Sequence, residues 1–230
     1  VYLTHQIKVL SGSTSYISSS IHSYLINKFD QCWVPDITGN GNLSGEMSED
    51  HTLDIPVRFL GISSRLRKEK LEIKYQLTVL LSGPEPQREI LEKILLKTLK
   101  DYPGKILFIR GKKDPEPMIS ANNRIEIIDF LTGHKLEEAL NRSAAIVSRP
   151  GFSTLCDLAV LEKKAFFIPT PGQYEQEYLA ERMRAFGISP YCRQEDFSLK
   201  KLAEMEKFSG FKGFENSTPS QALFEFFKGK

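Results

Sequence analysis

The segment 148–157, which reads SRPGFSTLCD, follows an apolar run and holds residue types that could bind a phosphate. Gly151 permits a tight backbone turn, and Ser153 is placed to cap the helix that we expect to begin after it. The first turn of a helix exposes unpaired N–H groups and a partial positive charge, which favour an anion. A phosphate at this end would also meet the hydroxyls of Ser153 and Thr154. The spacing therefore predicts an anion site here.

Asp157 lies one turn further along the same helix. From that position its carboxylate can accept two hydrogen bonds from the vicinal hydroxyls of a ribose. The alternative interpretation is that Asp157 only stabilises the positive end of the helix dipole. Its spacing after the Arg-Pro-Gly turn favours the ribose interpretation.

A second segment, LLSGPEPQRE at 80–89, also places a turn between a strand and a helix. Ser82 and Gly83 end the strand, and the helix is expected to begin near Pro86. The start of that helix could hold a phosphate, although a single glycine is equally typical of an ordinary strand–helix turn.

The elements that position these segments alternate along the chain. Strands are expected at 1–4, 31–35, 57–61, 74–83, 105–111, 124–130, 144–148 and 165–169, and helices at 16–28, 86–100, 135–142, 154–162 and 174–186. In the first helix Ile17, Ile21, Tyr24, Leu25 and Phe29 fall on one face. Several of the later strands are near-continuous apolar runs, as in sheets covered on both sides. The pattern predicts an α/β protein with a Rossmann-like parallel sheet and helices on both faces.

We expect a domain boundary near 62–72, after a polar loop at 36–56. Residues 1–65 and 66–215 are therefore expected to belong to two different domains. A C-terminal helix within 216–230 has a capping-box start, since Thr218 stands three residues before Gln221. Its apolar face must dock on the rest of the protein, and we expect it to cross back to the N-terminal part.

Composition excludes several classes of protein. The chain has 230 residues, of which 40% are hydrophobic and 26% charged, and its net charge is +2. This balance gives no bulk attraction to nucleic acid or to an anionic membrane. No apolar run approaches the roughly 20 residues that span a bilayer. The three cysteines have no metal-binding spacing, so reduced thiols in a cytoplasmic protein are expected. The chain also has no acidic Asp-x-Asp cluster, so neither a metal ion nor a cofactor is expected.

The segment from Ser148 to Met183 resembles the donor-binding region of the GT-B glycosyltransferases of family 28. The matching residues are Arg149, Gly151, Ser153, Thr154, Asp157, Pro169 and Gln176. Other segments also match the family in their order along the chain. They surround His5 and Gln6, Arg65, Ser82 and Gly83, and Phe130 and Leu131. The resemblance implies the two-domain GT-B fold, with residues 1–65 as part of the N-terminal, acceptor-side Rossmann-like domain and 66–215 as the nucleotide-sugar donor-binding domain. It also implies that the chain begins inside the N-terminal domain.

The resemblance also implies a role for each matching residue. The donor diphosphate would contact Arg65, Ser82, Gly83, Arg149, Gly151, Ser153 and Thr154. Asp157 would bind the ribose, backbone groups near Phe130 and Leu131 the base, and Gln176 and Glu177 the donor sugar. The catalytic base is not assigned, and His5 is the one histidine considered as a candidate for the site.

The implied function is that of an inverting glycosyltransferase, of which this chain is the donor-binding part. It would transfer a sugar from a nucleoside diphosphate sugar, namely a UDP-sugar, to a hydroxyl of a carbohydrate or lipid-linked acceptor. The full-length enzyme would lie in the cytoplasm, with peripheral association at the inner face of the membrane. Two alternatives stay open: a nucleotide-sugar hydrolase or 2-epimerase of the same architecture, and a non-catalytic donor-binding subunit that needs a partner chain.

Overall fold

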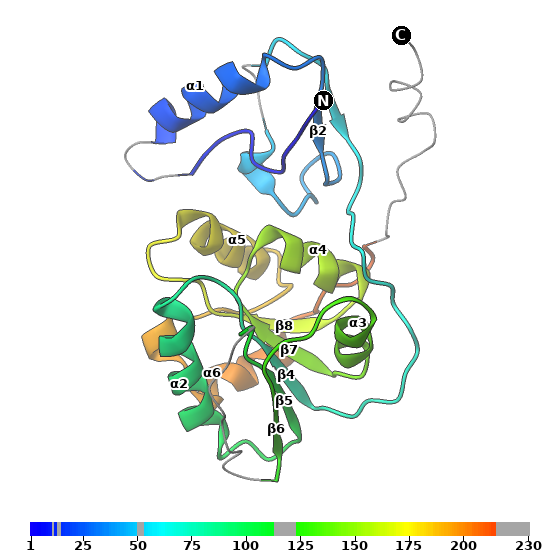
Figure 1. The fold of residues 1–230 in the computed structure, drawn as a ribbon, viewed down its shortest axis with the longest axis vertical. Helices are drawn as coiled ribbons and strands as arrows, with labels where there is room; N and C mark the ends of the chain where they lie inside the picture. Colours follow the sequence, from blue (N-terminus) through cyan, green and yellow to red (C-terminus); the bar gives the residue numbers. More distant parts are fainter. Residues whose placement is uncertain (11, 13–14, 50–52, 113–122, 215–230) are drawn as a thin grey trace. The chain divides into compact units, whose positions relative to one another are not determined.

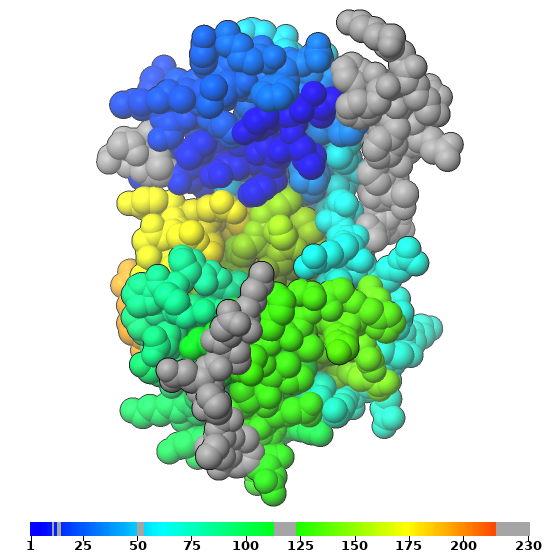
Figure 2. Space-filling model, viewed as in Figure 1, coloured from blue at the N-terminus to red at the C-terminus, as the bar shows by residue number. Residues whose placement is uncertain are grey.

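The computed structural model describes residues 1–10, 12, 15–49, 53–112 and 123–214 (Figure 1). The chain divides into two compact units, the first built on Val1–Ser64 and the second on Arg65–Gly213. They can be followed by colour in Figure 2, from blue to cyan and from cyan to orange. The expected C-terminal helix within 216–230 lies outside the described residues.

The first unit holds a small parallel sheet of order β1-β2-β3, formed by Tyr2–Leu3, Cys32–Val34 and Val57–Phe59. Helix α1 (Ser15–Ile26) connects β1 to β2, and the short 3-10 helix η2 (Gly45–Met47) lies between β2 and β3. Cys32 pairs with Tyr2 on one side and with Val57 on the other. The only tryptophan of the chain, Trp33, is buried in this unit.

The polar segment after β2 is organised by one buried carboxylate. Asp36 is 0% exposed and accepts hydrogen bonds from the backbone N–H groups of Ile37 at 2.8 Å, Leu43 at 3.1 Å and Ser44 at 2.7 Å. The Ser44 hydroxyl also donates to it. A carboxylate with several donors is a strong acceptor, so Asp36 closes this loop into a defined shape.

Helix α1 packs against the first unit through a different face from the apolar face that the sequence pattern predicted. Ser23 and Ile26 are its buried residues. The apolar residues expected on one face, namely Ile17, Ile21, Tyr24, Leu25 and Phe29, are exposed. The Tyr2 hydroxyl lies 2.9 Å from His22 Nε2, so polar contacts contribute to holding α1 against β1.

The second unit holds a five-stranded parallel sheet of order β6-β5-β4-β7-β8. Its strands are β4 (Leu77–Leu80), β5 (Ile106–Ile109), β6 (Ile125–Ile128), β7 (Ala145–Ser148) and β8 (Lys164–Phe167). Its helices are α2 (Gln87–Leu99), α3 (Gly133–Asn141), α4 (Phe152–Val160), α5 (Tyr174–Ala185) and α6 (Leu199–Leu202), with 3-10 turns η3 (Gln194–Asp196) and η4 (Ala203–Lys207).

Helices cover both faces of this sheet. On one face Leu91 and Leu95 of α2 and Leu202 of α6 share a core with strand residues such as Leu77 and Phe166. Figure 1 shows α3 and α4 on the opposite side. The predicted fold class is therefore confirmed. Each helix expected between 86 and 186 is present, and both of its ends lie within two residues of the predicted bounds.

The strand order reverses at one place on the sheet. The chain moves outward from β4 through β5 to β6, then returns to the other side of β4 for β7 and β8. Ligands of open α/β sheets bind beyond the carboxyl ends of the strands, where the order reverses in this way. Leu80 of β4 pairs with Ser148 of β7, so the loops that follow these strands begin side by side.

Candidate functional site

Helix α4 begins two residues earlier than the sequence indicated. Its N-cap is Gly151 in an extended conformation, and no side chain caps it. The expectation that Ser153 caps the helix is therefore wrong: Ser153 lies inside the first turn and is exposed, because the helix already starts at Phe152. The first intrahelical bond runs from Leu155 N to Gly151 O at 3.0 Å. The hydroxyls of Ser153 and Thr154 are thus not used as caps, and they stand beside the first-turn N–H groups.

Asp157 shares a helix face with these hydroxyls. It stands four residues after Ser153 and three after Thr154, which is the spacing of neighbours on a helix surface. The three residues are exposed or half-buried, whereas Leu155, Cys156 and Leu158 on the other side are buried in the unit. One face of α4 therefore presents N–H groups, two hydroxyls and a carboxylate in a row.

The turn after β4 lies beside this face at the carboxyl edge, but its electrostatics differ. Ser82 and Gly83 are exposed, and Gly83 has a φ of +96°, which favours glycine. The start of α2 is already occupied by a carboxylate, since Glu85 Oε2 accepts from Glu89 N at 3.0 Å. The hydrogen bond from Arg88 Nη2 at 2.6 Å lowers the pKa of Glu85, so this negative charge persists. Of the two helix starts, α4 is the better place for an anion.

Arg149 does not reach the surface. The side chain is 1% exposed, and its Nη1 donates to the carbonyls of Ile168 at 2.9 Å and Pro169 at 2.8 Å. Its Nη2 donates to Gln87 O at 3.1 Å and to Gln194 Oε1 at 2.6 Å. A guanidinium held in this way does not fit direct contact with a diphosphate. Arg149 therefore belongs to the scaffold that holds these segments together.

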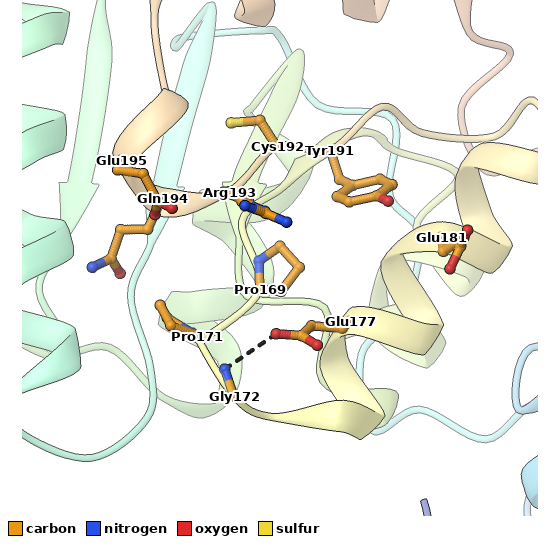
Figure 3. A pocket seen from close by; sticks show the side chains of 10 residues that line it. All are labelled: Pro169, Pro171, Gly172, Glu177, Glu181, Tyr191, Cys192, Arg193, Gln194 and Glu195. Atoms are coloured by element: carbon orange, nitrogen blue, oxygen red, sulfur yellow. Dashed lines mark hydrogen bonds between the residues drawn. The ribbon is translucent and has the colours of Figure 1, made fainter. Parts of the chain in front are cut away.

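Gln176 and Glu177 sit at the start of α5 and hold the loop that follows β8. Gln176 Oε1 accepts from Thr170 N at 2.8 Å, and Glu177 Oε1 accepts from Gly172 N at 3.1 Å. Figure 3 shows Glu177 turned toward Gly172 at one side of a pocket. One oxygen of each side chain is thus used to shape the loop, and contact with a sugar stays a prediction.

The pocket in Figure 3 has a volume of about 420 Å³ and lies between α5 and the segment 191–195. Glu177 and Glu181 line one side, and Arg193 and Glu195 line the other. Burial raises the pKa of the neighbouring Cys192 thiol to about 12, so this cysteine is a neutral lining group.

The remaining predicted residues lie on separate segments. Arg65 is exposed at the start of the second unit, and Phe130, which is 44% exposed, follows β6 together with the half-buried Leu131. His5 belongs to the first unit, where it follows β1 and is half-buried. The strand order brings the segments after β4, β6, β7 and β8 to one sheet edge, and the role of each residue there stays a prediction.

Sequence reasoning missed a buried ion-pair network at the end of β5. Arg110 Nε lies 2.7 Å from Glu92 Oε1, and Arg110 Nη1 lies 2.9 Å from Asp129 Oδ1. Glu92 could have been noticed, because it lies on α2 beside the buried Leu91 and Leu95. Within the described ranges there is no group of three or more His, Cys, Asp or Glu side chains arranged to hold a metal ion. Those ranges also contain no helix that is long and apolar enough to span a bilayer.

Comparison with known proteins places these features in a family. The chain is 21% identical over 205 residues to the UDP-N-acetylglucosamine--N-acetylmuramyl-(pentapeptide) pyrophosphoryl-undecaprenol N-acetylglucosamine transferase of Haemophilus ducreyi, covering 86% of this chain and 54% of that protein. The enzyme of the same name from Histophilus somni is also 21% identical, with 89% and 56% covered. The chain thus spans about half the length of the curated relatives it matches.

Solved structures show the same fold at low sequence identity. Acinetobacter baumannii MurG superposes with a TM-score of 0.54 at 12% identity, covering 91% of this chain and 69% of MurG. The calicheamicin glycosyltransferase CalG4 gives 0.57 at 11% identity, with 90% and 60% covered. Phytolacca americana UGT2, complexed with UDP-2fluoro-glucose and pterostilbene, gives 0.56 at 14% identity, with 86% and 48% covered.

The family itself follows from a match to the glycosyltransferase family 28 C-terminal domain over residues 86–218, which is more than half of the chain. This range contains strand β7, helix α4 with its polar face, and the loop between β8 and α5, whereas strand β4 precedes it. The chain belongs to glycosyltransferase family 28.

Proposed function

We propose that this chain is the donor-binding part of an inverting glycosyltransferase that takes its sugar from a UDP-sugar. The observation that carries the proposal is the polar face of α4 at the point where the strand order reverses. The first-turn N–H groups and the hydroxyls of Ser153 and Thr154 suit a diphosphate, and Asp157 suits a ribose. The choice of UDP draws on the names of the curated relatives and on the nucleotide sugar bound in the UGT2 structure.

The chemistry asked of these groups is stabilisation of a leaving group. The acceptor hydroxyl oxygen forms a bond to the anomeric carbon of the sugar, and the bond from that carbon to the diphosphate oxygen breaks. The hydroxyl proton passes to a base that is not assigned, and UDP departs with the bonding electrons. Helix N–H groups aimed at the developing negative charge, together with Arg65, would lower the barrier of this step.

We infer the acceptor and the location of the protein from the names of its curated relatives. The curated relatives act on a lipid-linked substrate according to their names, and we propose a carbohydrate or lipid-linked acceptor for this protein. A lipid-linked acceptor would bring the full-length enzyme to the inner face of the membrane as a peripheral protein. Analysis of the products formed from the donor alone distinguishes transfer from the hydrolase and 2-epimerase alternatives, because only those two reactions need no acceptor.

Calorimetric titration with UDP, with and without a chelator, tests the donor site. Asp157→Ala removes charge-assisted hydrogen bonds worth about 1.5–3 kcal/mol, so Kd should rise roughly ten- to a hundred-fold. Asp101→Ala is the matched control, since Asp101 is an exposed carboxylate just after the end of α2, away from the strand carboxyl ends. It should leave Kd unchanged.

Two results would contradict the proposal. If Asp157→Ala binds UDP as tightly as the unaltered protein, the ribose assignment is wrong. If binding disappears with the chelator, a metal ion holds the diphosphate and the helix start does not suffice.

A further inference from the structure

Arg149 joins the segments that surround the proposed donor site. Its guanidinium donates to Gln87 at the start of α2, to Ile168 and Pro169 after β8, and to Gln194 in η3. The residue itself follows β7 and stands two positions before Gly151, the N-cap of α4. The Arg149 side chain therefore links the carboxyl ends of β7 and β8 to the start of α2, and it lies close in sequence to the start of α4.

The charge of Arg149 is not balanced by a carboxylate. Among the residues that the structure describes, all four hydrogen-bond acceptors of Arg149 are uncharged oxygens, and its buried Nε has no partner. Burial lowers the pKa of Arg149 to about 10, so the guanidinium remains charged at neutral pH. Arg110, the other arginine whose side chain is almost fully buried, is paired with the carboxylates of Glu92 and Asp129.

A buried charge without a counter-ion is costly, and its field is screened much less than that of a surface charge. The positive end of α4 adds to this field at the same edge of the sheet. An anion at the start of α4 would offset both. A neutral ligand at the same place would gain nothing from the charge.

We propose that Arg149 is a positioning residue that fixes the loops after β7 and β8 and attracts a diphosphate electrostatically, without touching it. The inference rests on the proposed function, because it requires a diphosphate at the start of α4. It assigns to Arg149 the discrimination between a charged nucleotide and the uncharged nucleoside.

The test compares Kd for UDP with Kd for uridine, by calorimetry and by NMR titration, in Arg149→Gln, Arg149→Lys and the control Arg110→Gln. In Arg149→Gln, Kd for UDP should rise about ten-fold while Kd for uridine changes less than about three-fold. Arg149→Lys keeps the charge and should keep the ratio of the two constants within about three-fold of the unaltered protein. Arg110→Gln should leave the ratio unchanged, because Arg110 is already paired.

Equal weakening of UDP and uridine in Arg149→Gln would show that Arg149 acts only through structure, and would overturn the inference. If Arg149→Gln does not fold, a ratio lost in Arg149→Lys would overturn the inference equally. A failure of the donor site itself looks different: the unaltered protein would then bind neither UDP nor uridine, and both proposals would be wrong.

Discussion

Replacing Arg110 should destabilise the second unit more than replacing Arg110 and its partner together. Arg110 is 3% exposed and Glu92 2%, and their Nε and Oε1 atoms lie 2.7 Å apart. Arg110→Met leaves the Glu92 carboxylate buried, with Lys112 Nζ at 3.4 Å as its remaining cation. Breaking a buried pair costs about 3–5 kcal/mol, and the nearby lysine places our expectation near 3 kcal/mol. Asp129, the other partner, is half exposed and returns to water at little cost.

The double variant Glu92→Met/Arg110→Met removes both charges and fills the space with apolar side chains. We expect a loss of about 1 kcal/mol or less, since a hydrophobic replacement of a buried pair is often neutral. The double variant should therefore be about 2 kcal/mol or more above Arg110→Met in stability, which two additive losses cannot give. Urea unfolding followed by far-UV circular dichroism gives these free energies. The fluorescence transition of Trp33, which lies in the first unit, should stay in place and serves as the internal control.

Additive losses in the double variant would refute this reasoning. So would a loss below about 1 kcal/mol in Arg110→Met, because it would mean that water reaches Glu92.

Three further predictions concern other parts of the chain. Lys163 donates to the carbonyls of Asn141 and Ser143, and burial lowers its pKa from 10.5 to about 8. Between these two pKa values the unfolded chain binds more protons than the folded protein, so the stability contributed by Lys163 rises with pH. Lys163→Met should therefore remove about 1–2 kcal/mol of the increase in unfolding free energy between pH 7.5 and 9.5, measured by urea unfolding. Gly111→Ala should cost about 2–4 kcal/mol in the same assay, because φ is +70° and the new Cβ would lie 2.5 Å from the Leu81 carbonyl oxygen. Asp36→Asn should lower the free energy of unfolding of the first unit by about 2 kcal/mol, seen as a Trp33 fluorescence transition at lower urea. The reason is that an amide cannot accept all the hydrogen bonds that the Asp36 carboxylate accepts.

Periodicity predicted the elements of the second unit because its strands are apolar runs and its helices repeat regularly. It could not give the strand order, which depends on pairings between distant residues. For α1 the apolar face was read correctly, but which face packs depends on partners such as Tyr2 that lie outside the helix.

The candidate site shows the same division. The presence of a helix after the Arg-Pro-Gly turn, with Asp157 on its polar face, could be predicted from local spacing, but its first residue could not. The cap was misplaced because Gly151 in an extended conformation can begin a helix as well as a serine can. The resemblance to family 28 implied a contact between Arg149 and the diphosphate. The burial of Arg149 could not be predicted locally, because it depends on acceptors from Gln87 and Gln194, which are far away in the sequence.

The pairing of β4 with β7 also has a consequence for the order of folding. A single helix separates β4 from β5 along the chain, and a single helix separates β7 from β8. The pairing of Thr78 with Ile146 instead closes a much longer stretch of chain, which includes β5, β6 and α3. Contacts between distant residues carry the larger loop-closure cost and tend to form late. The junction of β4 and β7, where we propose that the donor binds, should therefore form only when two separately formed halves of the sheet meet. A ligand that spans this seam should slow amide exchange of Thr78 and Ile146 more than that of the outer strands, since it stabilises only the joined state.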